Sequence, residues 1–272
     1  MPQPRRRRET GSDLGPRVLV ALVVLPPVLV LIALGQEAFA LLALVLGILC
    51  LHELYGMLSD ALPARLAGFI GLIGLSAAAL YGTPYDVLLA TVAVVPVLFF
   101  LTVAGPSSEG GVVGMSITLL GVYWVGLAIA HAIMLRELPH GGGIVIDVLV
   151  GTFIGDSGAY FGGRWFGQRK LAPRISPNKT VEGLVIGILT AILAVWCAGL
   201  YQDWLSGTDA LLIGLGIALA APTGDLFESF IKRSVGTKDT GTLFGAHGGA
   251  LDRLDALLFS FVVTYYVWQG LL

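Results

Sequence analysis

Long apolar stretches separated by short polar connections run through almost the whole chain. A helix needs about 20 apolar residues to cross the hydrocarbon core of a bilayer, and most of the stretches have about that length. The second and third stretches are shorter, and each could form either a tilted helix or a helix that lies partly at the membrane interface. The pattern predicts an all-α polytopic fold with about nine transmembrane helices, at residues 17–36, 38–52, 66–81, 87–104, 112–135, 143–163, 181–200, 208–231 and 254–272.

The composition supports the membrane interpretation. Of the 272 residues, 56% are hydrophobic and only 12% are charged, whereas a soluble domain carries about 25% charged residues. This balance excludes a soluble globular domain, a disordered chain and a collagen-like repeat. The two cysteines, Cys50 and Cys197, lie inside apolar runs and form neither a metal-binding spacing nor a disulfide framework.

A basic run, Arg5 to Arg8, precedes the first apolar stretch and resembles the start of a secretory signal. The stretch is too long for a signal peptide, however, and eight further stretches follow it. The sequence therefore predicts a disordered cytoplasmic tail over residues 1–16, followed by a retained first helix.

The positions of the cations predict the orientation. If the N-terminus is cytoplasmic and the connections alternate, 15 of the 16 Lys and Arg residues face the cytoplasm, and only Arg136 lies outside. Positive residues concentrate on the cytoplasmic side of membrane proteins. We therefore expect a multi-pass protein of the cell membrane with its C-terminus outside. The two largest connections, 164–180 and 232–253, are cytoplasmic, so we expect the chemistry at that surface.

Four carboxylates fall near the cytoplasmic ends of the predicted spans: Asp156, Asp225, Asp252 and Asp255. Burying a charge in a membrane is costly, so such residues suggest function. Structural roles are also open, because Asp252 and Asp255 could complement a helix dipole, and Asp156 and Asp225 could each pair with a Lys or Arg. Carboxylates that converge without thiolates or paired histidines suit a hard cation such as Mg²⁺, with one or two ions left open.

Three further ionisable residues are interpreted differently. Asp147 lies near the outer end of its span, away from the others, and is expected to be structural. His52 and Glu53 end the second span on the cytoplasmic side and are expected to be interfacial rather than catalytic.

Several residues near these carboxylates suit phosphate. Asp225, Ser229 and Lys232 are spaced i, i+4 and i+7, which places a carboxylate and an ammonium on one face of a helix. The segment 176–183 starts the next predicted helix with capping residues and Lys179, and a helix N-terminus beside a lysine is a common phosphate site. No Walker A pattern occurs in the sequence, so a P-loop ATPase is not indicated.

From Ser229 to Asp255 the chain reads S-x-x-K-R-x4-K-D-x7-H-G-G-x2-D-R-x-D. This pattern closely resembles the phosphatidate cytidylyltransferase (CDP-diacylglycerol synthase) family, and residues 156–160, 166–167 and 176–183 also look like that family. The resemblance implies a single transmembrane catalytic domain over residues 17–272, with the signature in 143–272. It also implies a reaction in which CTP and phosphatidic acid give CDP-diacylglycerol and pyrophosphate with Mg²⁺.

The resemblance carries roles over to matching positions. The implied catalytic residues are Lys232, Asp225 and Asp252, and the implied metal ligands are Asp225, Asp252, Asp255, Asp239 and Asp156. The implied substrate-binding residues, most of which would contact phosphate, are Lys179, Ser176, Ser229, Arg233, Lys238, His247, Gly248, Gly249 and Arg253. For His247, an acid role and a structural role in the loop are both open.

The expected partners are CTP, phosphatidic acid and membrane lipids, and no nucleic acid. The 37 glycines permit close helix contacts, which would serve a homodimer or packing within one chain. Two other functions compete with the cytidylyltransferase interpretation. One is a secondary transporter whose intramembrane carboxylates bind ions. The other is a CTP-using lipid kinase, or a cytidylyltransferase acting on another lipid phosphate.

Overall fold

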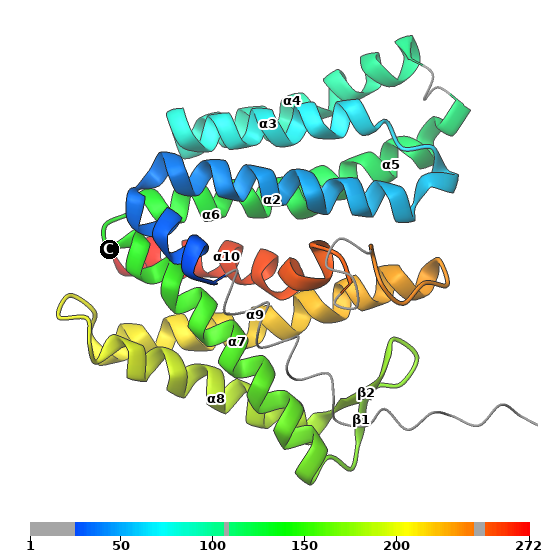
Figure 1. The fold of residues 1–272 in the computed structure, drawn as a ribbon. Coiled ribbons are helices and arrows are strands. Elements are labelled where there is room, and N and C mark those ends of the chain that lie inside the picture. Colours follow the sequence, from blue (N-terminus) through cyan, green and yellow to red (C-terminus); the bar gives the residue numbers. More distant parts are fainter. Residues whose placement is uncertain (1–24, 106–108, 242–247) are drawn as a thin grey trace, which may run out of the picture.

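The computed structural model describes residues 25–105, 109–241 and 248–272 (Figure 1). Within these residues, seven helices are long and apolar enough to cross a membrane. They are α2 (Gln36–Met57), α4 (Pro84–Ala104), the continuous helix Gly111–Glu137, α7 (Gly141–Phe166), α8 (Val181–Gly199), α9 (Gly207–Ser234) and α10 (Leu251–Leu271). The predicted all-α multi-pass fold is therefore confirmed.

Two shorter apolar helices, Leu25–Leu34 and α3 (Arg65–Tyr81), correspond to the first and third predicted spans. The count of nine spans stays a prediction, because these two are too short to qualify by length. Residues 17–24 of the first span and the tail at 1–16 lie outside the described residues. Gly35 separates Leu25–Leu34 from α2, and its φ of 122° is a conformation that favours glycine.

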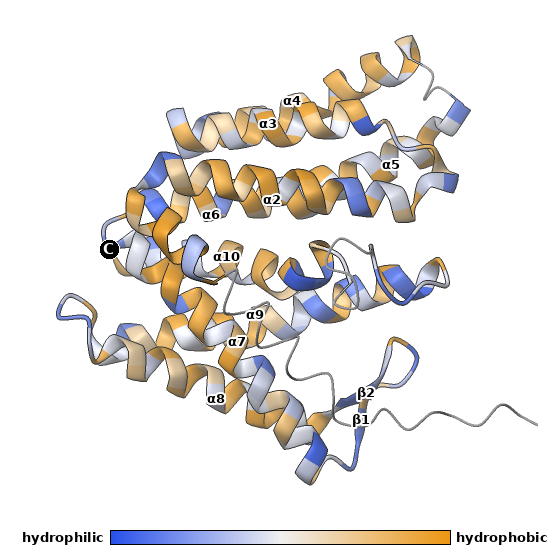
Figure 2. Cartoon of the chain, viewed as in Figure 1, coloured by the Kyte–Doolittle hydropathy of each residue, from blue (hydrophilic) through white to orange (hydrophobic). Residues whose placement is uncertain are grey.

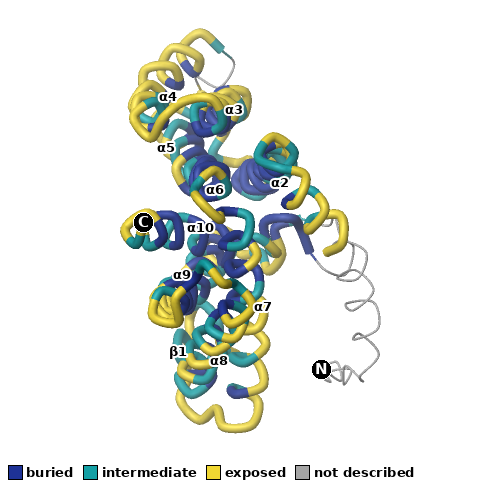
Figure 3. Tube along the Cα trace, turned by 90° about the vertical axis from the view of Figure 1, so that its left-hand side faces the viewer, coloured by how far each residue is buried: buried dark blue, intermediate teal, exposed yellow. Residues whose placement is uncertain are grey.

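The helix Gly111–Glu137 is built from α5 (Gly111–Gly121), a π-helical segment η3 (Val122–Gly126) and α6 (Leu127–Glu137). Figure 1 shows α2 to α6 stacked on one side of the molecule and α7 to α9 on the other, with α10 between α6 and α9. The buried residues run through α2, α6, α10 and α9 (Figure 3). Hydrophobic residues predominate along the helices (Figure 2), and many of the large ones are exposed, as expected for helices that face lipid.

Small residues allow α7 and α8 to pack closely. A Cβ added at Gly155 would lie 2.9 Å from the Cβ of Ala191, and one added at Gly187 would lie 2.8 Å from the Cβ of Ala159. Larger side chains at these two glycines would push the helices apart, which is the usual role of small residues between membrane helices.

The connections alternate between two ends of the bundle. At one end Arg136 donates to the Ile32 carbonyl at 3.0 Å, Trp268 donates to the Pro139 carbonyl at 2.9 Å, and Asp147 is fully buried and accepts from Gln202 at 2.8 Å. Arg136, the cation predicted outside, lies in the last turn of α6. The connection from α6 to α7 is at the opposite end of the bundle from the connection between α7 and α8 (Figure 1). Which end faces the cytoplasm remains a prediction.

A short antiparallel hairpin, which the sequence analysis did not predict, connects α7 to α8. Strand β1 (Lys170–Ala172) pairs with β2 (Ser176–Thr180), with Lys170 opposite Thr180 and Ala172 opposite Ser176. The predicted cap that follows it is present, because the Thr180 hydroxyl accepts from the Gly183 N–H at 3.1 Å. The hairpin directs Lys179 toward α9, which positions part of the site.

Candidate functional site

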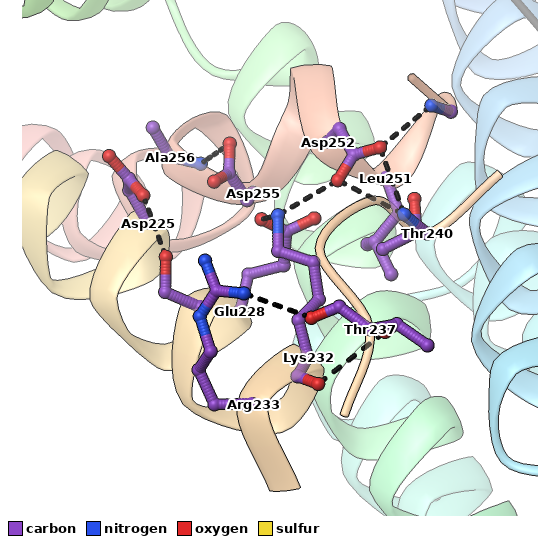
Figure 4. A network of polar contacts seen from close by, with 12 residues as sticks. Asp225, Glu228, Lys232, Arg233, Thr237, Thr240, Leu251, Asp252, Asp255 and Ala256 are labelled. Carbon is purple, nitrogen blue, oxygen red and sulfur yellow. Dashed lines mark hydrogen bonds and ion pairs between the residues drawn. The ribbon is translucent and has the colours of Figure 1, made fainter. Parts of the chain in front are cut away.

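Lys232 on α9 bridges two carboxylates (Figure 4). Its ammonium donates to Glu228 Oε2 at 2.5 Å and to Asp252 Oδ1 at 2.8 Å. The side chains of Lys232, Glu228 and Asp252 are only 12%, 1% and 10% exposed. The bridge therefore joins the end of α9 to the start of α10 in a nearly dry environment, where a charge must be paired.

Asp252 also organises the loop that precedes α10. Its Oδ2 accepts from the Gly249 N–H at 2.7 Å and from the Thr240 N–H at 3.1 Å. Gly248 has a φ of 78°, and a Cβ there would collide with the Asp252 carboxylate. The loop therefore needs glycine at 248 for both conformation and space. His247, which the sequence assigned to this loop, lies outside the described residues.

A second lysine–carboxylate pair joins the hairpin to α9. Lys179 on β2 forms an ion pair with Asp225, and the Ser229 hydroxyl donates to Asp225 Oδ1 at 3.4 Å. The predicted contact between positions 225 and 229 on one face of α9 is thus present. Asp225 remains 34% exposed, so this pair is more accessible than the Lys232 bridge.

Two more carboxylates extend this network. Asp255 is buried on α10, and Asp156 lines a small hollow between α7, α8 and α9. Asp225 is close enough for its charge to act on both of them, and Glu228 lies beside Asp255 (Figure 4). Including Asp252, five carboxylates therefore share one polar region with the two lysines of the ion pairs.

The donor set of this region suits the implied Mg²⁺ in its chemistry. Carboxylate oxygens are the ligands that Mg²⁺ prefers, and the carboxylates outnumber the two lysines. The buried Oε1 of Glu228 has no hydrogen-bond partner within the residues that the structure describes. Across the part of the chain that the structure describes, however, no three His, Cys, Asp or Glu side chains lie close enough to hold one metal ion. The residues fit a cation in charge and chemistry, and the metal assignments stay predictions.

The remaining predicted substrate-binding residues surround this region. Arg233 is exposed and donates to the carbonyls of Ile175 at 3.3 Å and Thr237 at 3.1 Å. These contacts attach the hairpin and the loop after α9 to the same guanidinium. Of the other predicted substrate-binding residues, Ser176 is half-buried and Lys238 and Arg253 are exposed. Asp239, a predicted metal ligand, is also exposed.

Two acidic residues of this region were missed by the sequence analysis. Glu228 lies four residues before Lys232, a spacing that could have identified it as a partner. Glu53, which was expected to be interfacial, is buried on α2, where its Oε1 accepts from the Ala250 N–H at 2.8 Å and its Oε2 from the Leu251 N–H at 2.9 Å. Its signal was an acidic residue at the predicted cytoplasmic end of an apolar helix.

A model of the cytidylyltransferase family matches residues 15–271. The chain is 32% identical over 268 residues to the phosphatidate cytidylyltransferase of Bacillus subtilis (strain 168), a match that covers 94% of this chain and 97% of that protein.

Other matches are shorter. The phosphatidate cytidylyltransferase of Pseudomonas aeruginosa is 40% identical over 148 residues, which are 53% of this chain and 52% of that protein. The uncharacterized protein YnbB of Escherichia coli (strain K12) is 36% identical over 182 residues, covering 63% of this chain and 61% of that protein. The chain thus spans nearly all of the Bacillus relative and less than two thirds of these two.

Proposed function

The chain belongs to the cytidylyltransferase family, and from this premise we propose that it transfers the cytidylyl group of CTP to phosphatidic acid, giving CDP-diacylglycerol and pyrophosphate. The observation that carries the proposal is the pair of lysine–carboxylate bridges at one end of the helical bundle. Lys179 pairs with Asp225, and Lys232 pairs with Glu228 and Asp252. These bridges bring together the two kinds of group that a magnesium nucleotide needs, ammonium for phosphate and carboxylate for the cation.

The nucleophile is a phosphate oxygen of phosphatidic acid. A phosphate monoester has a second pKa near 6, so this oxygen is largely anionic at neutral pH and needs no strong base. It forms a bond to the α-phosphorus of CTP, while the bond from that phosphorus to the bridging oxygen breaks. Pyrophosphate leaves with the electron pair. The main barrier is therefore the repulsion between two anions and the charge that develops on the leaving group.

The lysines lower this barrier by electrostatic stabilisation. Lys232 is held by Glu228 and Asp252 at the end of α9. Arg233 and Lys238 follow it in the chain. These three cationic side chains would contact the phosphates of the nucleotide. Lys179, with Ser176 on the same strand, would hold a second phosphate-bearing group. We assign the two phosphate-bearing substrates to different lysines because the structure has two separate bridges. One joins the hairpin to α9, and the other joins α9 to α10.

Asp225 and Asp255 would each offer carboxylate oxygens to Mg²⁺. Because no three such side chains converge among the described residues, water and the phosphates of the nucleotide would complete the coordination of the ion. Asp252 was also predicted as a ligand, but one ammonium and two backbone N–H groups already occupy its oxygens. When bound, Mg²⁺ would neutralise phosphate charge. Each lysine is paired with a carboxylate. A bound phosphate would draw the ammoniums away from the carboxylates, and a bound Mg²⁺ would draw the carboxylates away from the ammoniums. Binding of the nucleotide should therefore favour binding of Mg²⁺, and the reverse.

The site suits a lipid substrate. The acyl chains of phosphatidic acid stay in the bilayer while its headgroup lies at the interface. The ion-paired residues of the candidate site likewise gather at one end of membrane-length helices. We assign this end to the cytoplasm because the predicted cytoplasmic segments hold nearly all the cations. Reporter tags at the two termini should report opposite sides of the membrane. Finding both tags on one side would contradict this assignment.

The deciding experiment uses purified protein in lipid nanodiscs with Mg²⁺, phosphatidic acid and CTP labelled in its α-phosphate. We expect label to enter the lipid fraction as CDP-diacylglycerol. Parallel reactions with γ-labelled CTP would detect a lipid kinase, which transfers the γ-phosphate and leaves the α-label in nucleotide. Label transfer only with another lipid phosphate would change the assigned acceptor. No turnover of CTP would reject the enzymatic proposal and favour transport.

A further inference from the structure

Glu53 is the acidic side chain through which the first half of the chain reaches the candidate site. It lies on α2, which packs with α3 and α6 on the opposite side of α10 from α7 and α8. Its hydrogen-bond partners Ala250 and Leu251 lie about 200 residues later in the chain, at separations of 197 and 198. The contact depends on the tertiary fold alone.

The Glu53 carboxylate closes the N-terminus of α10. The first N–H groups of a helix have no acceptor within the helix. Ala250 and Leu251 are 1% and 0% exposed, so water cannot serve as the acceptor for their N–H groups. Glu53 supplies an acceptor to each. A negative charge also interacts favourably with the positive end of a helix dipole. The start of α10 therefore has a fixed position relative to α2.

The same carboxylate connects to Asp252 through Thr240. The Thr240 hydroxyl donates to Glu53 Oε2 at 3.2 Å, and its N–H donates to Asp252 Oδ2 at 3.1 Å. Asp252 in turn accepts from Lys232. A continuous chain of hydrogen bonds thus runs from Glu53 through Thr240 and Asp252 to Lys232.

The backbone packs tightly around Glu53. A Cβ added at Gly249 would overlap its carboxylate, and one added at Gly241 would lie 2.9 Å from Glu53 Oε1. Glycine at both positions lets the backbone approach a side chain that a larger residue would displace. This close fit is unlike that of an interfacial acid whose side chain points into water.

We infer that Glu53 is a positioning residue for the proposed reaction: it holds the start of α10 and Thr240 so that Asp252 and Lys232 keep their geometry. It does not contact the reacting atoms. The inference rests on the proposed function for its effect on turnover, whereas its structural part, the fixing of the α10 N-terminus, can be measured without any reaction.

The test compares Glu53→Gln with Glu37→Gln, an exposed acid on the same helix. Glutamine keeps the size of Glu53, but its NH₂ group cannot accept from an N–H. We expect kcat to fall by about 10²-fold in Glu53→Gln, the scale of a small misplacement of catalytic groups. KM for CTP should change little, and hydrogen exchange should accelerate at the start of α10. Glu37→Gln should match the unsubstituted protein in all three measurements.

A second pair of variants covers the case in which Glu53→Gln does not fold. Thr240→Val removes the hydroxyl at constant shape and should lower kcat, and Thr240→Ser, which restores the hydroxyl, should recover it. Unchanged kcat in Glu53→Gln, or equal kcat in the valine and serine variants, would overturn the inference. If the unsubstituted protein transfers no cytidylyl group, the proposed function fails, and the exchange measurement still decides whether Glu53 fixes α10.

Discussion

Removal of the Lys232 ammonium should destabilise the fold more than the loss of a surface lysine. Lys232→Met keeps an unbranched side chain but leaves Glu228 and Asp252 without their shared cation. Glu228 is 1% exposed, and among the described residues its Oε1 has no hydrogen-bond partner. Breaking a buried ion pair by removing one member costs about 3–5 kcal/mol. We expect a loss of that size in the free energy of unfolding.

The double variant Lys232→Met/Glu228→Gln separates this electrostatic cost from lost packing. Neutralising Glu228 removes the uncompensated buried charge, while Asp252 keeps its bonds from the N–H groups of Thr240 and Gly249. We therefore expect the double variant to regain about half or more of the lost free energy of unfolding, because the effects of substitutions at contacting residues do not simply add. Activity should stay about 10²–10³-fold low in both variants, the cost of losing one donor to a charged transition state.

The assay is unfolding of the purified protein by SDS in mixed micelles, combined with cytidylyl transfer in nanodiscs. Lys170→Met is the stability control, because Lys170 is exposed on the hairpin and such substitutions change stability by about 0.5 kcal/mol or less. A strictly additive double variant would refute the assigned coupling between Lys232 and Glu228. Normal turnover in Lys232→Met would refute its role toward phosphate.

Three further predictions concern charge and backbone. Asp225→Asn should lower cytidylyl transfer by about 10²-fold while the protein still inserts in the membrane, and near-normal turnover would remove Asp225 from the proposed metal site. Gly248→Ala should lower both stability and turnover. Gly236 has a similar φ of 73° but open space around it, so Gly236→Ala should incur only the backbone cost of about 1–2 kcal/mol. Equal losses of stability in the two variants would reject the proposed clash at Gly248. In vesicles, Lys170→Gln and Arg174→Gln should each raise KM for phosphatidic acid about fivefold, because a cation near the surface attracts anionic lipid by about 1 kcal/mol. A water-soluble short-chain phosphatidic acid is the control, and an unchanged KM in vesicles would contradict the prediction.

The local features of the fold were predictable because each depends on a short segment of sequence. A membrane helix satisfies its own backbone hydrogen bonds, so apolar length alone indicated where helices form. The contact of Ser229 with Asp225 joins residues four positions apart, and the cap at Thr180 joins residues three positions apart. The hairpin was missed because its two strands contain only three and five residues, too few to show an alternating pattern.

The long-range part of the site could not be predicted in the same way. Lys179 on the hairpin meets Asp225 on α9, and Lys232 meets Asp252 across a loop. Glu53 meets the start of α10 across most of the chain. Helices surrounded by lipid are apolar on nearly all sides, so their sequences carry little record of which face meets which neighbour. Glu53 therefore looked like an ordinary interfacial acid.

The sequence by itself determined that this is a multi-pass helical membrane protein, and its polar motif determined the family that it resembles. These properties depend on hydropathy and on residues close together in the chain. Only the tertiary structure decided that Lys179 pairs with Asp225, that Asp252 accepts from Lys232, and that α2 supplies an acceptor for α10. Such pairings are set by how the helices pack, because a buried charge or an unpaired N–H is stable only where another segment provides its partner.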